Sequence, residues 1–187
     1  IFVKGTTEAI NLVANAWGRD NVKEGDIIVT TEYEHHSNIV PWQLLTQDKK
    51  AQLKYIDIDD NGELMIDQLD EYLSTGKVKL VAFSHVSNVL GTITPAKEII
   101  SKCKNAGVKT LIDGAQAVPH MKVDLTELDC DFYAFSAHKM LGPTGVGVLW
   151  AKKEILEKMT PYQGGGDMIR EVHKYETIWN DLPYKFE

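Results

Sequence analysis

The chain has few cysteines, no long apolar run and no excess of basic residues, and each absence removes a class of protein. Cys103 and Cys130 are the only cysteines, which excludes a disulfide framework and favours a reducing, cytoplasmic compartment. No segment reaches the apolar length of a membrane span, so we expect no membrane partner. The 20 basic and 27 acidic residues give a formal net charge of −7, which disfavours nucleic acid as a partner.

What remains is the composition of an ordinary globular domain. Of the 187 residues, 43% are hydrophobic and 25% are charged, which suffices to bury a core within one domain. The sequence begins inside an apolar run, Ile1-Phe2-Val3, without an initiator methionine, and its last residues carry no clear terminal signal. We therefore expect an internal piece of a longer protein.

Apolar runs of strand length alternate with helical patterns along the chain. Several runs are almost continuously apolar, as in strands that are covered on both faces. The spacing i, i+3, i+4, i+7 indicates helices through residues 10–17 and 96–103, the second with Pro95 at its first position and Gly107 just past its end. The predicted strands cover residues 1–3, 26–30, 52–56, 80–84, 110–113, 132–135 and 147–151. This alternation predicts an α/β fold with a mainly parallel seven-stranded sheet and helices on both faces.

Polar residues follow five of the predicted strands at the points where the strands end. They are Thr6 and Thr7, His35, Asn88, Asp113, and the run Ser136-Ala137-His138-Lys139. In parallel sheets, ligands bind beyond the carboxyl ends of the strands. We therefore expect these residues to meet in one site.

The types of residue in this set match the needs of pyridoxal phosphate. Lys139 offers a Schiff-base amine, Asp113 a carboxylate for a protonated pyridine nitrogen, and His35 a flat ring to stack on the cofactor. The hydroxyls of Thr6 and Thr7, at a helix start, are suited to a phosphate. The sequence thus predicts a pyridoxal phosphate site on residue chemistry alone.

Each of these residues has a simpler explanation when taken alone. A single lysine is usually a solvated surface residue. Aspartate and threonine are favoured helix N-caps, which would account for Asp113 and for one of Thr6 and Thr7 without any ligand. Cys103 falls on the apolar stripe of its helix and is most simply a core residue. The convergence of five strand ends is what favours the functional interpretation.

No metal site is expected. His35 and His36 are adjacent in an extended segment, so their side chains point to opposite sides and chelate one ion poorly. No zinc motif is present. The stretch from Asp57 to Gly62 resembles the start of a calcium loop, but its closing position holds Gln68 instead of glutamate, so we interpret it as a strand-to-helix turn.

The order of the motifs resembles the class V aminotransferase superfamily, and more narrowly its Suf-type cysteine desulfurases and selenocysteine lyases. The motifs that carry the resemblance are Gly5-Thr6-Thr7-Glu8-Ala9-Ile10-Asn11, Glu34-His35-His36-Ser37-Asn38-Ile39-Val40-Pro41-Trp42, His85-Val86-Ser87-Asn88-Val89-Leu90-Gly91-Thr92, Asp113-Gly114-Ala115-Gln116 and Ser136-Ala137-His138-Lys139. The resemblance runs from Ile1 to about Ile169. It implies the large domain of a fold type I pyridoxal phosphate enzyme, here residues 1–187, without the N-terminal segment and the C-terminal small domain.

The resemblance also implies a role for each site residue. Lys139 would carry the cofactor and later move the α-proton, with His35 stacked on one face of the ring and Ala115 packed on the other. Asp113 would bind the pyridine nitrogen. The remaining contacts implied are Asn88 and Gln116 on the phenolic-oxygen side of the ring, and Thr6, Thr7, Ser136 and His138 on the phosphate. The family pattern usually has glycine where Ala137 stands, and one added methyl is not expected to abolish binding.

The implied activity is conversion of L-cysteine to L-alanine, with the sulfur passed as a persulfide to an acceptor protein for iron–sulfur cluster assembly. The implied assembly is a homodimer. The sulfur-accepting cysteine and an arginine for the substrate carboxylate lie in the family's C-terminal region, so neither Cys103 nor Cys130 is assigned that role. Three alternatives stay open: a lyase acting on L-selenocysteine, another class V enzyme acting on an amino acid, and an inactive fragment that only binds the cofactor.

Overall fold

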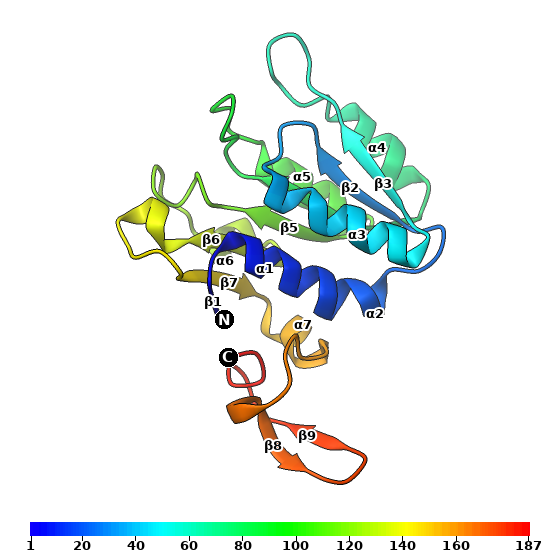
Figure 1. The fold of residues 1–187 in the computed structure, drawn as a ribbon. Coiled ribbons are helices and arrows are strands. Elements are labelled where there is room, and N and C mark those ends of the chain that lie inside the picture. The colour runs from blue at the N-terminus through cyan, green and yellow to red at the C-terminus, as the bar shows by residue number, and fades with distance from the viewer.

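The computed structural model describes residues 1–187 as a seven-stranded sheet covered by helices, followed by a small two-stranded hairpin (Figure 1). The strands are β1 (Phe2–Val3), β2 (Ile27–Thr31), β3 (Gln52–Ile56), β4 (Val78–Ser84), β5 (Lys109–Asp113), β6 (Phe132–Ser136), β7 (Gly147–Ala151), β8 (Ile169–Val172) and β9 (Thr177–Trp179). The helices are α1 (Thr6–Leu12), α2 (Arg19–Asn21), α3 (Val40–Lys49), α4 (Asp67–Ser74), α5 (Ala96–Asn105), α6 (Leu125–Leu128) and α7 (Lys153–Lys158). Short 3-10 or π segments are η1 (Val13–Gly18), η2 (His36–Asn38), η3 (Ala137–Met140) and η4 (Gly166–Met168).

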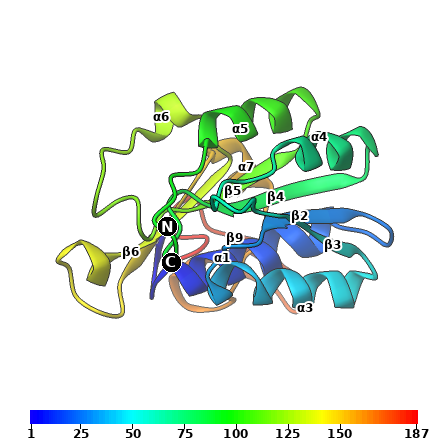
Figure 2. The same ribbon diagram turned by 90° about the horizontal axis from the view of Figure 1, so that it is seen from above.

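The large sheet has the strand order β1-β7-β6-β5-β4-β2-β3. Strands β3, β2, β4, β5 and β6 pair in parallel, and β7 runs antiparallel between β6 and β1. Helices α1 and α3 cover one face, and α4, α5 and α6 cover the other (Figure 2). The predicted fold class, a mainly parallel seven-stranded sheet with helices on both faces, is confirmed.

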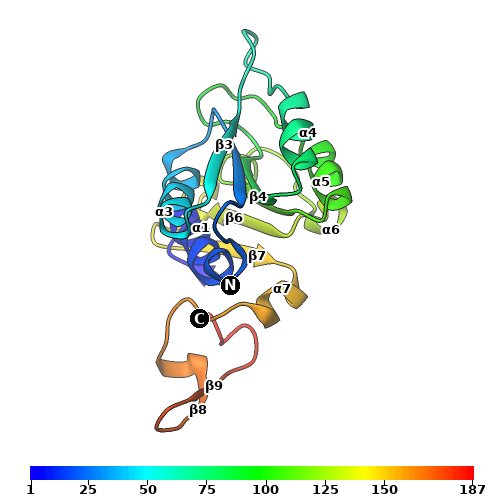
Figure 3. The same ribbon diagram turned by 90° about the vertical axis from the view of Figure 1, so that its right-hand side faces the viewer.

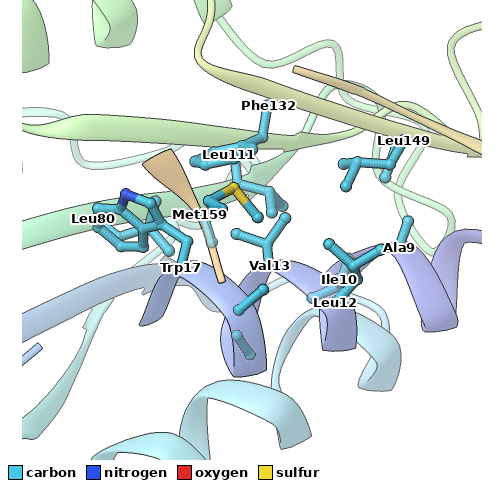
Figure 4. Packing of buried hydrophobic residues seen from close by; sticks show 14 of the residues in the cluster. Ala9, Ile10, Leu12, Val13, Trp17, Leu80, Leu111, Phe132, Leu149 and Met159 are labelled. Carbon is cyan, nitrogen blue, oxygen red and sulfur yellow. The ribbon is translucent and has the colours of Figure 1, made fainter. Parts of the chain in front are cut away.

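Two apolar clusters fill the space between the sheet and its helices. One joins α1, η1 and α3 to the sheet, with the Trp17 ring packed edge-on against Phe132 at a centroid distance of 6.0 Å (Figure 4). The other joins α4 and α5 to the opposite face and contains both cysteines. Because each central strand contributes side chains to both clusters, its sequence is apolar without alternation.

The predicted helices differ from the observed ones in detail. The first continues from α1 through a π-helical segment, η1, into α2, and Ile10, Val13, Ala14 and Trp17 are all buried as expected. Pro95 is the N-cap of α5 and not its first helical residue, because its ψ of 66° is not helical and its carbonyl accepts the first hydrogen bonds, from Glu98 and Ile99. Gly107 ends the helix region with φ of +70°.

The segment after α7 leaves the sheet and forms the hairpin of β8 and β9, which the sequence pattern did not predict. The hairpin projects away from the seven-stranded sheet (Figures 1 and 3). Its two strands pair antiparallel, and none of their residues is buried.

No helix anywhere in the chain has the length and apolar character needed to cross a membrane.

Candidate active site

All ten residues predicted from the sequence line a single cavity of about 180 Å³, here called the edge cavity. They lie at the carboxyl ends of β1, β2, β4, β5 and β6 or in the segments that follow these strands, as the parallel topology requires. The lining consists of Thr6, Thr7, His35, Asn88, Asp113, Ala115, Gln116, Ser136, His138 and Lys139, together with Ser37, Ser84 and Val86. A larger cavity of about 530 Å³ beside α5 and α6 contains none of the ten.

Asp113 is a buried carboxylate at the end of β5. Its Oδ1 accepts a hydrogen bond from the Ala115 amide at 2.9 Å, and its other oxygen has no hydrogen-bond partner within the protein. Burial raises the pKa of Asp113, while the Ala115 bond and the charges of Lys139 and His35 act in the opposite direction. No helix begins directly after Asp113, since the next helix, α6, starts at Leu125, so the N-cap explanation does not apply to Asp113.

Thr6 and Ser136 tie the start of α1 to the end of β6. The Thr6 amide donates to Ser136 Oγ at 2.8 Å, and the two hydroxyl oxygens are also 2.8 Å apart. The N-cap of α1 is Gly5, and no side chain caps the helix, so helix capping does not explain the threonines. Gly5 lies directly against Gly147, where an added Cβ would come within 2.5 Å of the Gly5 Cα. This close backbone approach brings the helix start to the cavity.

Lys139 lies in η3, immediately after β6. Its side chain is exposed at the edge cavity and makes neither an ion pair nor a hydrogen bond within the protein. Its positive charge acts to lower the pKa of Asp113, which lines the same cavity. The amine is therefore available to a ligand in a cavity that also contains a buried carboxylate.

His35 stands at the N-terminus of η2 with its ring held by the next turn. Its Nδ1 accepts a hydrogen bond from the Ser37 amide at 3.2 Å and lies 2.5 Å from the Ser37 hydroxyl oxygen, so the Ser37 turn holds this nitrogen of the ring. The neighbouring His36 does not line the cavity. Only one of the two histidines is therefore placed to contact a ligand there.

Glu34 is the residue that sequence reasoning missed. It is buried, and its carboxylate accepts four hydrogen bonds. Oε1 accepts the Thr31 hydroxyl at 2.5 Å and the Ser84 amide at 2.8 Å. Oε2 accepts the Ser84 hydroxyl at 2.7 Å and the Asn38 side-chain amide at 2.6 Å. Burial raises the pKa of Glu34 to about 7 against the effect of these bonds.

The whole chain, residues 1–187, matches the family model described as Aminotransferase class-V. The chain belongs to this family. It is 54% identical over its full length to a probable cysteine desulfurase of Halalkalibacterium halodurans, of which the match covers 46%.

Solved structures of two proteins with similar sequences share this fold. The cysteine desulfurase CsdA of Escherichia coli superposes with a TM-score of 0.96 at 38% identity, over 100% of this chain and 47% of that one. A mutant of C-DES with glycine covalently linked to its pyridoxal phosphate cofactor superposes with a TM-score of 0.86 at 26% identity, over 100% and 50%. The chain thus spans about half the length of these relatives.

Ala137 stands where the family resemblance leads one to expect glycine. The structure accommodates its methyl group because residue 142 is glycine. A Cβ at Gly142 would lie 2.8 Å from the Ala137 Cβ, and the Gly142 amide donates to the Ala137 carbonyl at 2.9 Å. The two small residues therefore pack as a pair at the base of the Lys139 turn.

Neither cysteine of this class V chain is placed for chemistry in the cavity. Cys103 and Cys130 are both buried in the cluster beneath α5, and neither lines the edge cavity. Burial raises the pKa of both thiols to about 12, so neither is a thiolate at neutral pH. No group of three or more metal-ligating side chains is present in the chain.

Proposed function

We propose that this chain is the pyridoxal phosphate-binding large domain of a cysteine desulfurase. The observation that carries the proposal is the edge cavity itself, in which five strand ends place a free lysine, a buried carboxylate, a histidine ring and a set of hydroxyls around one space. The family membership supports it, as do the relatives that are named cysteine desulfurases.

The cavity residues fit the cofactor on physical grounds. Asp113 is 5% exposed and keeps one carboxylate oxygen without a partner, facing a cavity that also holds Lys139. A protonated ring nitrogen would supply both the missing hydrogen bond and a compensating charge. The same cavity is also lined by hydroxyl groups and by the exposed His138, which provide donors of the kind that bind phosphate.

Pyridoxal phosphate, when bound, supplies an electron sink for the substrate α-carbon. The Lys139 Nζ would hold the cofactor covalently and later, once freed as an amine, accept the α-proton of the substrate. Asp113 would keep the ring nitrogen protonated, because a buried carboxylate stabilises a neighbouring cation. His35 and Ala115 would cover opposite faces of the ring. Asn88 and Gln116 would orient its phenolic-oxygen side, and the phosphate would be held by Thr6, Thr7, Ser136 and His138.

The substrate we propose is L-cysteine, which leaves as L-alanine while its sulfur passes to a cysteine thiolate and then to an acceptor protein. Cys103 and Cys130 are excluded from that role by their burial and raised pKa values. The family resemblance implies that the sulfur-accepting cysteine lies outside these 187 residues. We propose that the whole protein is a cytoplasmic homodimer in which a further domain completes the site.

The experiment begins with the chain itself. Added pyridoxal phosphate should give a visible absorption band, and borohydride should fix the cofactor on the peptide that contains Lys139, as read by mass spectrometry. The whole protein should then release alanine from L-cysteine in the presence of a thiol reductant. A cofactor bound at Lys139 without alanine release would contradict the desulfurase assignment, and no adduct at Lys139 would contradict the cofactor site.

A further inference from the structure

Glu34 is a buried carboxylate that the proposed chemistry does not use. It is 7% exposed, lies between the end of β2 and η2, and does not line the edge cavity. Hydrogen bonds alone hold its carboxylate. Keeping such a group away from water is costly unless each of its oxygens is satisfied, and here each oxygen accepts two bonds.

The position of Glu34 connects two residues of the edge cavity that come from different strands. On one side Glu34 is covalently joined to His35. On the other side it binds both the amide and the hydroxyl of Ser84 at the end of β4. Ser84 is the register partner of Asp113 in the parallel pair of β4 and β5, and it lines the cavity itself. A continuous path therefore runs from His35 through Glu34 and Ser84 to Asp113.

We infer that Glu34 is a positioning residue that fixes the His35 turn against β4, so that the His35 ring and the Asp113 carboxylate keep a set separation across the edge cavity. The consequence for cofactor binding rests on the proposed function, whereas the effect on His35 does not. Thr31 and Asn38 complete the attachment from β2 and η2.

The network has a fixed direction that a substitution can test. Trp42 Nε1 donates to Asn38 Oδ1 at 2.9 Å, so the Asn38 amide nitrogen must face Glu34. Glu34→Gln keeps the shape of the side chain. Its new amide nitrogen, which is a donor, would face the amide nitrogen of Asn38, which is also a donor. The double change Glu34→Gln with Asn38→Asp restores the match, because the new carboxylate at position 38 would accept from both the Trp42 indole and the new amide at position 34.

The first measurement is the dissociation constant of pyridoxal phosphate, from titration of the visible absorbance, at a temperature where circular dichroism shows each variant folded. Glu34→Gln should weaken binding by about tenfold, the effect of one mismatched buried hydrogen bond. It should also weaken the visible circular dichroism of the bound cofactor. The double variant should recover most of both. A group that only stabilised the fold would change the unfolding temperature and neither of these properties.

The second measurement needs no cofactor. The imidazole nitrogen signals of His35, assigned by their loss in His35→Gln, should shift in cofactor-free Glu34→Gln and return in the double variant. If the wild-type chain binds no pyridoxal phosphate, the proposed function fails while this measurement still tests Glu34. If Glu34→Gln does not fold, Thr31→Val removes one donor outside the cavity, and it should shift the same signals by less. Unchanged His35 signals and unchanged affinity in a folded variant would overturn the inference, as would a double variant no better than Glu34→Gln.

Discussion

The edge cavity and the C-terminal segment 160–187 differ in how firmly the rest of the fold holds their residues. The cavity residues stand on short turns at the ends of buried strands, and hydrogen bonds such as that from Thr6 to Ser136 tie the turns together. In the C-terminal segment only Phe186 is buried, and the β8–β9 hairpin projects from the body of the molecule (Figure 3). Positions that must be accurate are therefore anchored in the sheet.

The sharpest test of this difference replaces one lysine in each region. Lys139→Ala should abolish the borohydride-fixed adduct and the turnover of the whole protein, because no other amine lines the edge cavity. Lys174→Ala, in the exposed turn of the hairpin, should change neither. Mass spectrometry of the reduced protein provides the measurement. An adduct of normal yield in Lys139→Ala would show that the cofactor is attached elsewhere.

The next test compares two aspartates. Asp113→Asn should weaken pyridoxal phosphate binding by roughly ten- to a hundredfold, since a hydrogen bond between charged groups contributes about 1.5–3 kcal/mol. Asp181 pairs with Arg170 at the surface, where an exposed ion pair contributes little, so Asp181→Asn should bind the cofactor normally. Titration of the visible absorbance distinguishes the two. Equal affinities of wild type and Asp113→Asn would remove the ring-nitrogen partner from the proposal.

Whether a region is built on buried strands also decides how much of its structure can be predicted from the sequence. Strands β2, β4, β5 and β6 are apolar on both faces, so their ends, and the polar residues that follow, can be located without a structure. Most of the candidate residues can be predicted from these strand ends, whereas Ala115 and Gln116 follow only from the family resemblance. The structure places all of them around one cavity. The assignment of their individual roles stays a prediction.

Three features of the structure, the hairpin, the π-helical segment and the buried Glu34, have no recognisable pattern in the sequence. The hairpin strands have no buried face, and hydrophobic periodicity reports only burial. The π-helical segment η1 keeps the apolar spacing of an α-helix, so the spacing cannot distinguish it. Glu34 is a charged residue in a turn, which normally indicates solvent exposure. Its burial depends on donors from Thr31, Asn38 and Ser84, which only the folded chain brings together.

A smaller effect, on the free energy of unfolding, is expected when a glycine in each region is replaced by alanine. A Cβ at Gly114 would fall 2.0 Å from the Tyr133 ring, whose hydroxyl is hydrogen-bonded to His85 at 2.9 Å. Gly114→Ala should therefore displace the turn after Asp113 and lower the free energy of unfolding by about 1–3 kcal/mol. At Gly164 the added Cβ would make an ordinary contact with Trp179 at 3.7 Å, so Gly164→Ala should be close to neutral. Urea denaturation measures both, and a neutral Gly114→Ala would show that Tyr133 can move aside.

The smallest effect on stability is expected when an apolar residue of the β8–β9 hairpin is replaced by a polar one. Ile178, in β9, is 43% exposed, so Ile178→Ser should change the stability of the chain by no more than about 0.5 kcal/mol. Leu111, in β5, is fully buried, and Leu111→Ala should cost about 2–5 kcal/mol. Cofactor binding should be normal in Ile178→Ser, because no hairpin residue lines the edge cavity. A large loss of stability or of cofactor binding in Ile178→Ser would mean that the hairpin supports the sheet. The contrast between a site anchored in the sheet and a hairpin that contributes nothing to the core would then be wrong.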